Sequence, residues 1–325
     1  SSTGSAVPFT ATFNGGGTSP AGLVTVTPAS GTTPSALALS LNPVVLATLA
    51  PGAYSGNVTV SSTAIPGGDL TIKVNVTVSA AAPPAVVSVV NGASFAPGPV
   101  SPGEIISIFG TNLGPAPGQG FIPLNGKIDV NLAGTQVLFD NVPAPLIFVS
   151  FGQINAIVPY EVASLVNTGQ GTKMTVVRGG VASNQVVLGL TATSPAIFSA
   201  LQTGNGQGAI LNQNLSPNSA NNPAVKGTVV SIYATGEGSL TPFVPSGTIS
   251  GPSLPLPKPI ATPVTVTIGG QPATVSYAGE APGLVSGVIQ VNAMVPNGIG
   301  SGPQTVVLTI GTNANITQVI TVAVQ

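Results

Sequence analysis

The sequence predicts an all-β protein of three tandem immunoglobulin-like antiparallel β-sandwiches, and three observations support this fold class. Apolar residues alternate with Thr, Ser and Asn along many short segments, which is the period of a half-buried strand. Pro, Gly and Asn separate these segments at short intervals, as turns do in sandwiches. Sustained helical periodicity is missing, and only residues 42–49, with Pro43 at the first helical position, predict a short helical turn.

The segment 70–78 shows the alternation most clearly. Its even-numbered positions are apolar and its odd-numbered positions are polar, so a strand here has one core face and one solvent face. The same pattern recurs at 58–60, 264–268 and 320–324. The two faces of the first strand are Leu70, Ile72, Val74, Val76 and Val78 against Thr71, Lys73, Asn75 and Thr77.

A length of 325 residues corresponds to two or three domains, each large enough to enclose a core. The small-residue and proline run at 80–84 predicts a linker, and the stretch GNGQG near 199–208 predicts a second boundary. We therefore expect domains at residues 1–80, 85–199 and 200–325.

The last two domains look like copies of each other. Three motifs recur in the same order with similar spacing, which predicts an internal duplication. The matching pairs are 106–111 with 230–235, Pro143-Ala144 with Pro272-Ala273, and 154–159 with 291–296.

The composition excludes several classes of chemistry. The chain has no His and no Cys, so Ser-His, Cys-His and Cys/His-zinc sites have no residues to use. Charged residues make up 4% of the chain, against about 25% in an ordinary domain. The net charge of −1 provides no basic face, so we expect no nucleic-acid partner.

The hydropathy pattern predicts a folded protein without a membrane span. The chain is 43% hydrophobic and nearly neutral, unlike disordered segments. No apolar run reaches the roughly 18 to 20 residues of a membrane helix. The sequence has no initiator Met and no signal peptide, so we expect a mature product or a fragment of a longer precursor.

Five motifs in order carry a family resemblance: VVNGASFAPGPVSPGEIISIFGTNLGP, FGQINAIVPYEV, NPAVKGTVVSIYATGEG, YAGEAPGLVSGVIQVNAMVP and VVLTIG. Over about residues 85–325, the chain resembles the uncharacterised C-terminal domain family of secreted acidobacterial proteins. Each half resembles an IPT/TIG-type immunoglobulin-like sandwich. The resemblance implies an extracellular or cell-surface location and no established activity. Glu237 departs from the family, which usually has an apolar residue there.

Residues 1–79 resemble, more loosely, BACON-like immunoglobulin-type domains. The resemblance is carried by VTVTPASGTTPSALALSLNP and PGAYSGNVTVSS. Such domains usually have one or two strands before the segment that matches SSTGSAVPFTATF. The resemblance therefore implies that the first sandwich lacks its opening strand.

The N-terminal segment predicts a strand that inserts apolar side chains into a groove, with Pro8 at an edge where its missing donor costs little. An incomplete sandwich exposes backbone and core, and a strand from a neighbouring copy completes it in strand complementation. The alternative is that an upstream strand was trimmed from the chain. The candidate assembly residues are Val7, Phe9, Ala11 and Phe13, together with Ile320, Val322 and Val324 near the C-terminus.

No motif predicts catalysis. Gly236-Glu237-Gly238 follows a strand, as the glycine motif of a dinucleotide site does. However, Thr241 stands at the position of the third glycine, Pro242 follows it, and no helix is predicted there, so we interpret the motif as a turn. The seven acidic residues are scattered, and the three Asp are too far apart for a calcium loop. We expect a non-enzymatic protein with no catalytic site, no metal site and no cofactor.

Three sequons begin at Asn57, Asn75 and Asn315 and are candidate N-glycosylation sites. The alternative is that Asn and Thr simply occupy outward positions on strands. Both interpretations remain open in the sequence.

The leading functional hypothesis is a subunit of a cell-surface filament, with other copies of the chain as partners. The alternative is an adhesive or carbohydrate-binding module that contacts surface glycans. Four Tyr, ten Phe and no Trp offer few sugar platforms, and Phe109, Phe139 and Phe148 are expected in cores. A hydrolase is the third and weakest hypothesis.

Overall fold

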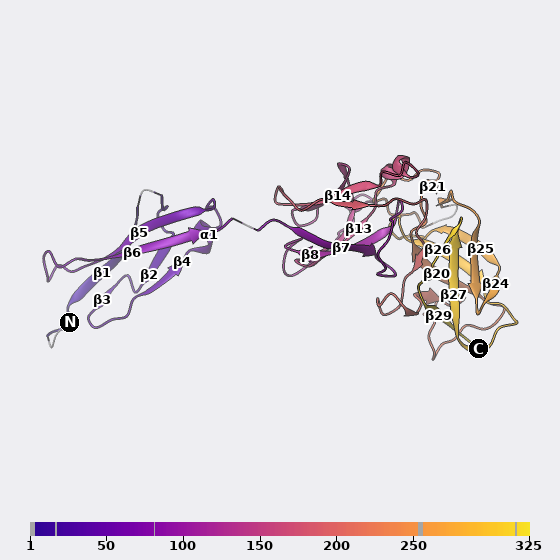
Figure 1. Ribbon diagram of the computed structural model, residues 1–325. Helices are drawn as coiled ribbons and strands as arrows, with labels where there is room; N and C mark the ends of the chain where they lie inside the picture. Colours follow the sequence, from indigo (N-terminus) through magenta and orange to yellow (C-terminus); the bar gives the residue numbers. More distant parts are fainter. Residues whose placement is uncertain (1–3, 17, 81, 253–255, 316) are drawn as a thin grey trace. The chain divides into compact units, whose positions relative to one another are not determined.

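The computed structural model describes residues 4–16, 18–80, 82–252, 256–315 and 317–325. The chain divides into two compact units, Ser1–Ala82 and Pro83–Gln325, and the division falls within the expected linker (Figure 1). Antiparallel strands make up nearly all regular structure, which confirms the all-β fold class. Among the helices formed by the described residues, none is long and apolar enough to cross a membrane.

The first unit packs a four-stranded sheet against a two-stranded ribbon. Asn42 caps the expected helical turn, because its Oδ1 accepts the Val44 N–H at 3.0 Å. The sheet order is β3-β1-β5-β6, and β2 pairs with β4. The elements are β1 (Pro8–Gly15), β2 (Val24–Thr27), β3 (Ser30–Thr32), β4 (Ala38–Leu41), α1 (Pro43–Leu46), β5 (Gly52–Ser61) and β6 (Leu70–Val78).

The second sandwich forms the first half of the second unit. One sheet has the order β7-β8-β13-β12-β9, and the other has the order β11-β10-β14-β15 with β16 also on β14. A 3-10 helix, η1 (Tyr160–Leu165), follows β13. The strands are β7 (Ala85–Asn91), β8 (Ile105–Thr111), β9 (Gln119–Gly120), β10 (Thr135–Phe139), β11 (Val142–Pro143), β12 (Leu146–Val149), β13 (Gln153–Ile157), β14 (Thr172–Arg178), β15 (Val181–Ala182) and β16 (Val186–Leu188).

The C-terminal sandwich repeats this arrangement. Its sheets run β17-β20-β26-β25, with β19 on β20, and β18-β29-β27-β23-β24, with β28 on β27; β21 and β22 form a separate ribbon. The strands are β17 (Ala196–Ile197), β18 (Gly206–Gln207), β19 (Ile210–Leu211), β20 (Val229–Thr235), β21 (Leu240–Thr241), β22 (Lys258–Pro259), β23 (Val264–Ile268), β24 (Gln271–Ala273), β25 (Val275–Glu280), β26 (Ile289–Met294), β27 (Gly302–Ile310), β28 (Asn313–Ala314) and β29 (Ile320–Val324).

The strand orders support the expected duplication. The order β8-β13-β12 in one half corresponds to β20-β26-β25 in the other, and β11-β10-β14 corresponds to β24-β23-β27. The boundary between the halves differs from the expected one, because β17 pairs with β20 and therefore belongs to the C-terminal sandwich. The C-terminal sandwich thus begins several residues before position 200.

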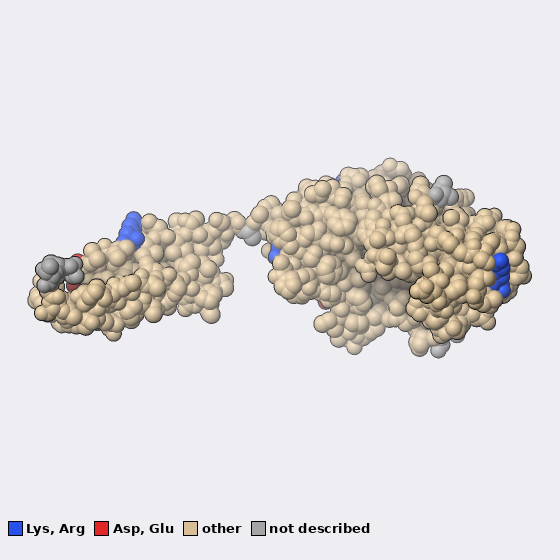
Figure 2. Space-filling model, turned by 90° about the horizontal axis from the view of Figure 1, so that it is seen from below, with Lys and Arg blue, Asp and Glu red and all other residues tan. Residues whose placement is uncertain are grey.

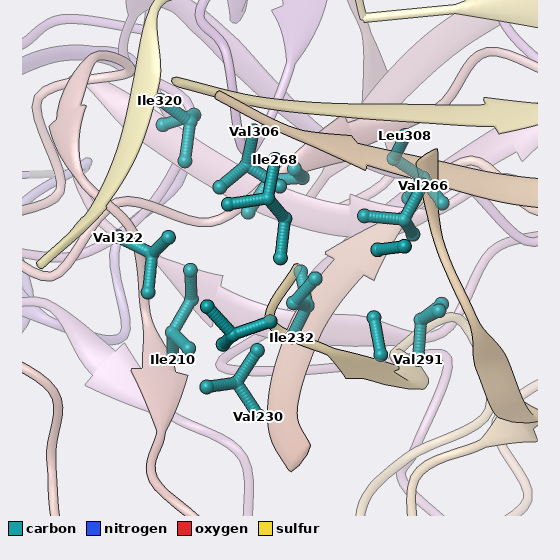
Figure 3. Close-up of a cluster of buried hydrophobic side chains, with 14 of the residues drawn as sticks. Ile210, Val230, Ile232, Val266, Ile268, Val291, Val306, Leu308, Ile320 and Val322 are labelled. Atoms are coloured by element: carbon teal, nitrogen blue, oxygen red, sulfur yellow. The ribbon is translucent and has the colours of Figure 1, made fainter. Parts of the chain in front are cut away.

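The core of the C-terminal sandwich lies between its two sheets. Figure 3 shows Ile232 and Val291 from one sheet facing Ile268, Leu308 and the neighbouring side chains of the other. Each of these four side chains has at most 2% of its surface exposed, as close packing of alternating faces requires.

Candidate functional site

The first sandwich leaves part of its core side uncovered. Ile72 pairs with Val58, which is fully buried, so both side chains point to the core side of the sheet. Leu41 pairs in the same way with the buried Val24 of the ribbon. We call these uncovered side chains the acceptor face, and they are Leu39, Leu41, Leu70 and Ile72, with 45%, 46%, 59% and 43% of their surface exposed.

The free edge of β6 lies beside this face. β6 pairs with β5 along its whole length and has no neighbour on its other side among the described residues. Natural edge strands are usually protected by charges, proline or a bulge. β6 contains no proline, its pairing shows no register shift, and Lys73 is its only charged residue. The edge is therefore open to pairing with a further strand.

The N-terminal candidate strand is already part of its own sheet. β1 lies between β3 and β5, with Phe9 and Ala11 8% and 2% exposed, and with Val7 and Phe13 half-buried. Pro8 pairs only with β3, because pairing with β5 starts at Thr10. The side of Pro8 that faces β5 is therefore unpaired, but β1 is an inner strand of its sheet and not the edge strand that we expected. Donation of this strand would require β1 to leave its sheet.

The C-terminal candidate strand is also occupied, which corrects our expectation. β29 pairs antiparallel with β27 and parallel with β18. Ile320, Val322 and Val324 are at most 2% exposed and belong to the core of the C-terminal sandwich. Figure 3 shows Ile320 and Val322 within this core. These three side chains are not available for strand exchange in the folded chain, because the sandwich would have to open to release them.

The three sequons differ in environment. Asn57 and Asn75 are exposed on β5 and β6. Asn315 is 4% exposed, its Oδ1 accepts the Leu308 N–H at 2.8 Å, and its Nδ2 donates to Gln318 at 3.2 Å. A glycan would have to be attached to Nδ2 of this enclosed side chain, so the burial of Asn315 argues against it as a glycan acceptor in the folded protein.

The turn Gly236-Glu237-Gly238 lies at the junction of the second and C-terminal sandwiches. Both glycines have positive φ, and a Cβ on either would meet a backbone oxygen of Ser194 or Ala192. Between them, Glu237 Oε1 accepts a hydrogen bond of 2.6 Å from the Tyr160 hydroxyl. The motif is therefore a turn, as we interpreted it, and its unusual carboxylate bonds to the other sandwich.

Two carboxyl groups at this junction are almost completely buried. Burial raises the pKa of Glu237 to about 8, and burial also raises the pKa of Glu104 to about 8. Glu104 accepts hydrogen bonds from Asn91 Nδ2 and the Ser101 N–H, each at 2.8 Å. No cation is among the groups that shift either pKa. Both groups are therefore mainly protonated at neutral pH.

These carboxyl groups do not form an accessible acid–base pair. Glu104 and Glu237 are each 1% exposed, and Glu280, a neighbour of Glu237, is 3% exposed. A substrate must reach the proton that a catalytic carboxyl transfers. In the described part of the chain, no group of three or more His, Cys, Asp or Glu is placed to hold a metal ion.

One cavity at the junction, with a volume of about 720 Å³, has walls rich in amides. Their polar atoms are already used inside the protein. Gln318 Nε2 donates to the carbonyls of Ala93, Ile197 and Gly204, while Asn91 bonds to Glu104 and to backbone groups. These amides hold the two sandwiches together and leave few free donors or acceptors for a ligand.

A second cleft, which the sequence analysis missed, lies between the same sandwiches. It has a volume of about 450 Å³, and Gln153, Asn155, Phe198 and Gln202 line it. The available signal was the repeated Gln-x-Asn motif, Gln153-Ile154-Asn155 in one half and Gln290-Val291-Asn292 in the other. Periodicity places both amides on a strand face, but it does not show what covers that face.

Comparison with known proteins identifies one domain. Residues 88–193 match the IPT/TIG domain, so an immunoglobulin-like domain of this type lies where the sequence resemblance placed it. The acidobacterial family and the BACON-like domain remain predictions. None of the curated proteins matches the chain.

Several solved structures are distantly similar. They include SGBP-B of the Bacteroides ovatus mixed-linkage glucan utilization locus, in complex with a mixed-linkage heptasaccharide. The two chains are 13% identical, the match covers 97% of this chain and 60% of that chain, and the TM-score is 0.31. Another is the full extracellular region of plexin A4, which is 13% identical, with a TM-score of 0.24. That match covers 74% of this chain and 16% of the plexin chain. This chain thus spans 60% of the length of SGBP-B, and at these TM-scores neither likeness carries an inference about function. The matched residues 88–193 show an IPT/TIG domain in this chain.

Proposed function

We propose that the protein is a non-catalytic subunit of an extracellular filament, in which a strand of one copy extends the first sandwich of the next. The acceptor face is the observation that supports this proposal. Its four large apolar side chains point to the core side and yet remain 43–59% exposed. Covering apolar surface is favourable by roughly 25 cal/mol per Å², and an added strand does so while pairing its backbone with β6.

In this proposal, two copies join through the edge strands of their first sandwiches, and no terminal strand leaves its own sheet. Both terminal strands already pair within their own sheets, whereas β6 and β3 are the two outer strands of one sheet. Addition of β6 of one copy to β3 of the next uses two different surfaces, so it leaves a free edge at each end. Repetition of this contact produces an open chain of subunits.

The surface chemistry supports assembly outside the cell. Figure 2 shows isolated Lys and Arg side chains on the face drawn, and most of that face is uncharged. Neutral surfaces of Thr, Ser and Asn approach one another without strong charge repulsion. The IPT/TIG domain is in keeping with an extracellular location. An adhesive or glycan-binding role, the second candidate, is supported by the 450 Å³ cleft.

The proposal is tested by electron microscopy and sedimentation of the full chain. Ile72→Lys places a charge on the acceptor face at a position that is 43% exposed, so the fold is expected to tolerate it. Thr71→Lys adds the same charge on the exposed opposite face of β6 and is the matched control. We expect filaments for the wild type and Thr71→Lys, and monomers for Ile72→Lys.

Two results contradict the filament. Wild-type protein that stays monomeric at high concentration with a stable first unit removes the need for a donated strand. A closed dimer of fixed mass shows that β6 pairs symmetrically with itself and that no open chain forms.

A further inference from the structure

The 450 Å³ cleft lies on the outer face of one sheet of the second sandwich. Ser107, Gln153 and Asn155 extend from β8 and β13 on the face opposite the core. The segment of the C-terminal sandwich that carries Phe198 and Gln202 forms the opposite wall. The volume falls in the range of small-molecule sites, about 300 to 1,000 Å³.

Two amides in the cleft are held in position and still have unused polar atoms. Asn155 Oδ1 accepts hydrogen bonds from Gln153 Nε2 at 2.8 Å and from Ser107 Oγ at 3.1 Å. Within the described residues, Asn155 Nδ2 and Gln153 Oε1 have no protein partner. The cleft therefore presents a fixed donor next to a fixed acceptor, unlike the 720 Å³ cavity, whose amides are occupied.

The other walls are apolar and uncharged. The half-buried side chains of Phe95 and Phe198 line the cleft together with Ile105 and Ile147. No charged residue lies among the lining residues. A charged ligand would lose its hydration here without gaining an ion pair, so the cleft favours a neutral ligand.

We propose that this cleft binds a neutral saccharide. Adjacent hydroxyl groups on a sugar ring both donate and accept hydrogen bonds, which matches the donor of Asn155 and the acceptor of Gln153. The C–H face of the ring packs on an aromatic side chain such as Phe198. The site lies wholly in the second unit, so it does not depend on strand addition to the first.

The test is binding of neutral oligosaccharides to the full-length protein, with sialylated and sulfated oligosaccharides as charged comparators. A glycan array selects the probe, and titration calorimetry measures its affinity. Gln153→Ala removes the acceptor, and we expect affinity to fall about fivefold, the value of one neutral hydrogen bond. Phe198→Leu keeps the site apolar but removes the aromatic face, and we expect a fall of at least that size.

The duplication supplies a matched control. Gln290 Nε2 donates to Asn292 Oδ1 at 2.8 Å, as Gln153 does to Asn155, but Gln290 does not line the cleft. Gln290→Ala therefore removes the same kind of hydrogen bond and should leave the affinity unchanged. The proposal is overturned if no neutral saccharide binds, if only charged ones bind, or if Gln153→Ala and Phe198→Leu bind as well as Gln290→Ala. Retained binding by monomeric Ile72→Lys separates this site from the filament contact.

Discussion

The first and the C-terminal sandwich are built from the same alternation of apolar and hydroxyl residues, but they bury their apolar side chains to different extents. The C-terminal core contains twenty buried apolar residues, whereas the described part of the first unit has five, Phe9, Ala11, Leu23, Val24 and Val58. Sheets of five and six strands face each other in the former, while a four-stranded sheet faces a two-stranded ribbon in the latter. Alternating apolar and polar residues are sufficient to form a strand. The apolar side chains of that strand become buried only where a second layer covers them.

The largest difference should appear when the same substitution is made in both cores. Ile232→Ala removes a fully buried side chain of the C-terminal core, and we expect the free energy of unfolding to fall by about 2–5 kcal/mol. Ile72→Ala, at a position that is 43% exposed, should cost less than about 1 kcal/mol in dilute monomer. Denaturant titration of the full chain measures both. Equal losses would show that the acceptor face is covered within one copy.

The second prediction concerns pH. Glu237 and Glu104 have pKa values raised to about 8, so the folded second unit holds their protons more tightly than the unfolded chain does. Their stabilising contribution is complete below about pH 4.5 and is lost as pH rises to about 8, so the stability of the second unit has a negative slope against pH in this window.

Calorimetry from pH 5 to pH 8 tests this slope. Glu237→Gln keeps an oxygen that accepts the Tyr160 hydroxyl and removes the titrating group, so it should reduce the slope by about half. The transition of the first unit, which contains neither carboxyl group, is the internal reference. A second unit whose stability does not fall across this range would contradict the assignment.

A third prediction compares two sequons. Asn315→Ala leaves the buried Leu308 N–H without its acceptor and should cost about 1–3 kcal/mol. Asn75→Ala changes an exposed side chain of β6 and should change the free energy of unfolding by less than about 0.5 kcal/mol. Thermal unfolding of both variants is sufficient, and similar shifts would mean that Asn315 is not structural.

The smallest expected effect is that of salt. The chain has only 4% charged residues, so contacts between copies contain few ion pairs for salt to screen. Sedimentation of the filament between low and physiological ionic strength should give nearly the same extent of assembly. Dissociation on such a change would show that charge holds the copies together.

The sequence predicted local structure better than burial. Alternation identified β6 and its two faces, but it did not show that Leu70 and Ile72 are exposed, since that depends on the size of the facing ribbon. Glu237 stood out as a departure from an apolar position, yet its partner Tyr160 lies 77 residues away in another sandwich. Asn315 matches the sequon motif, but the motif contains no information about the burial of this side chain or its hydrogen bond to Leu308.

The most direct test of the account is hydrogen exchange at the backbone amides of β6 in the full chain. In dilute monomer, the amides of Leu70–Val78 that face away from β5 have no strand partner and should exchange rapidly. In the filament they should become protected, while the amides of β27 remain protected in both states because that strand lies inside its sheet. Unchanged exchange of β6 on assembly would contradict completion of the first sandwich by another copy.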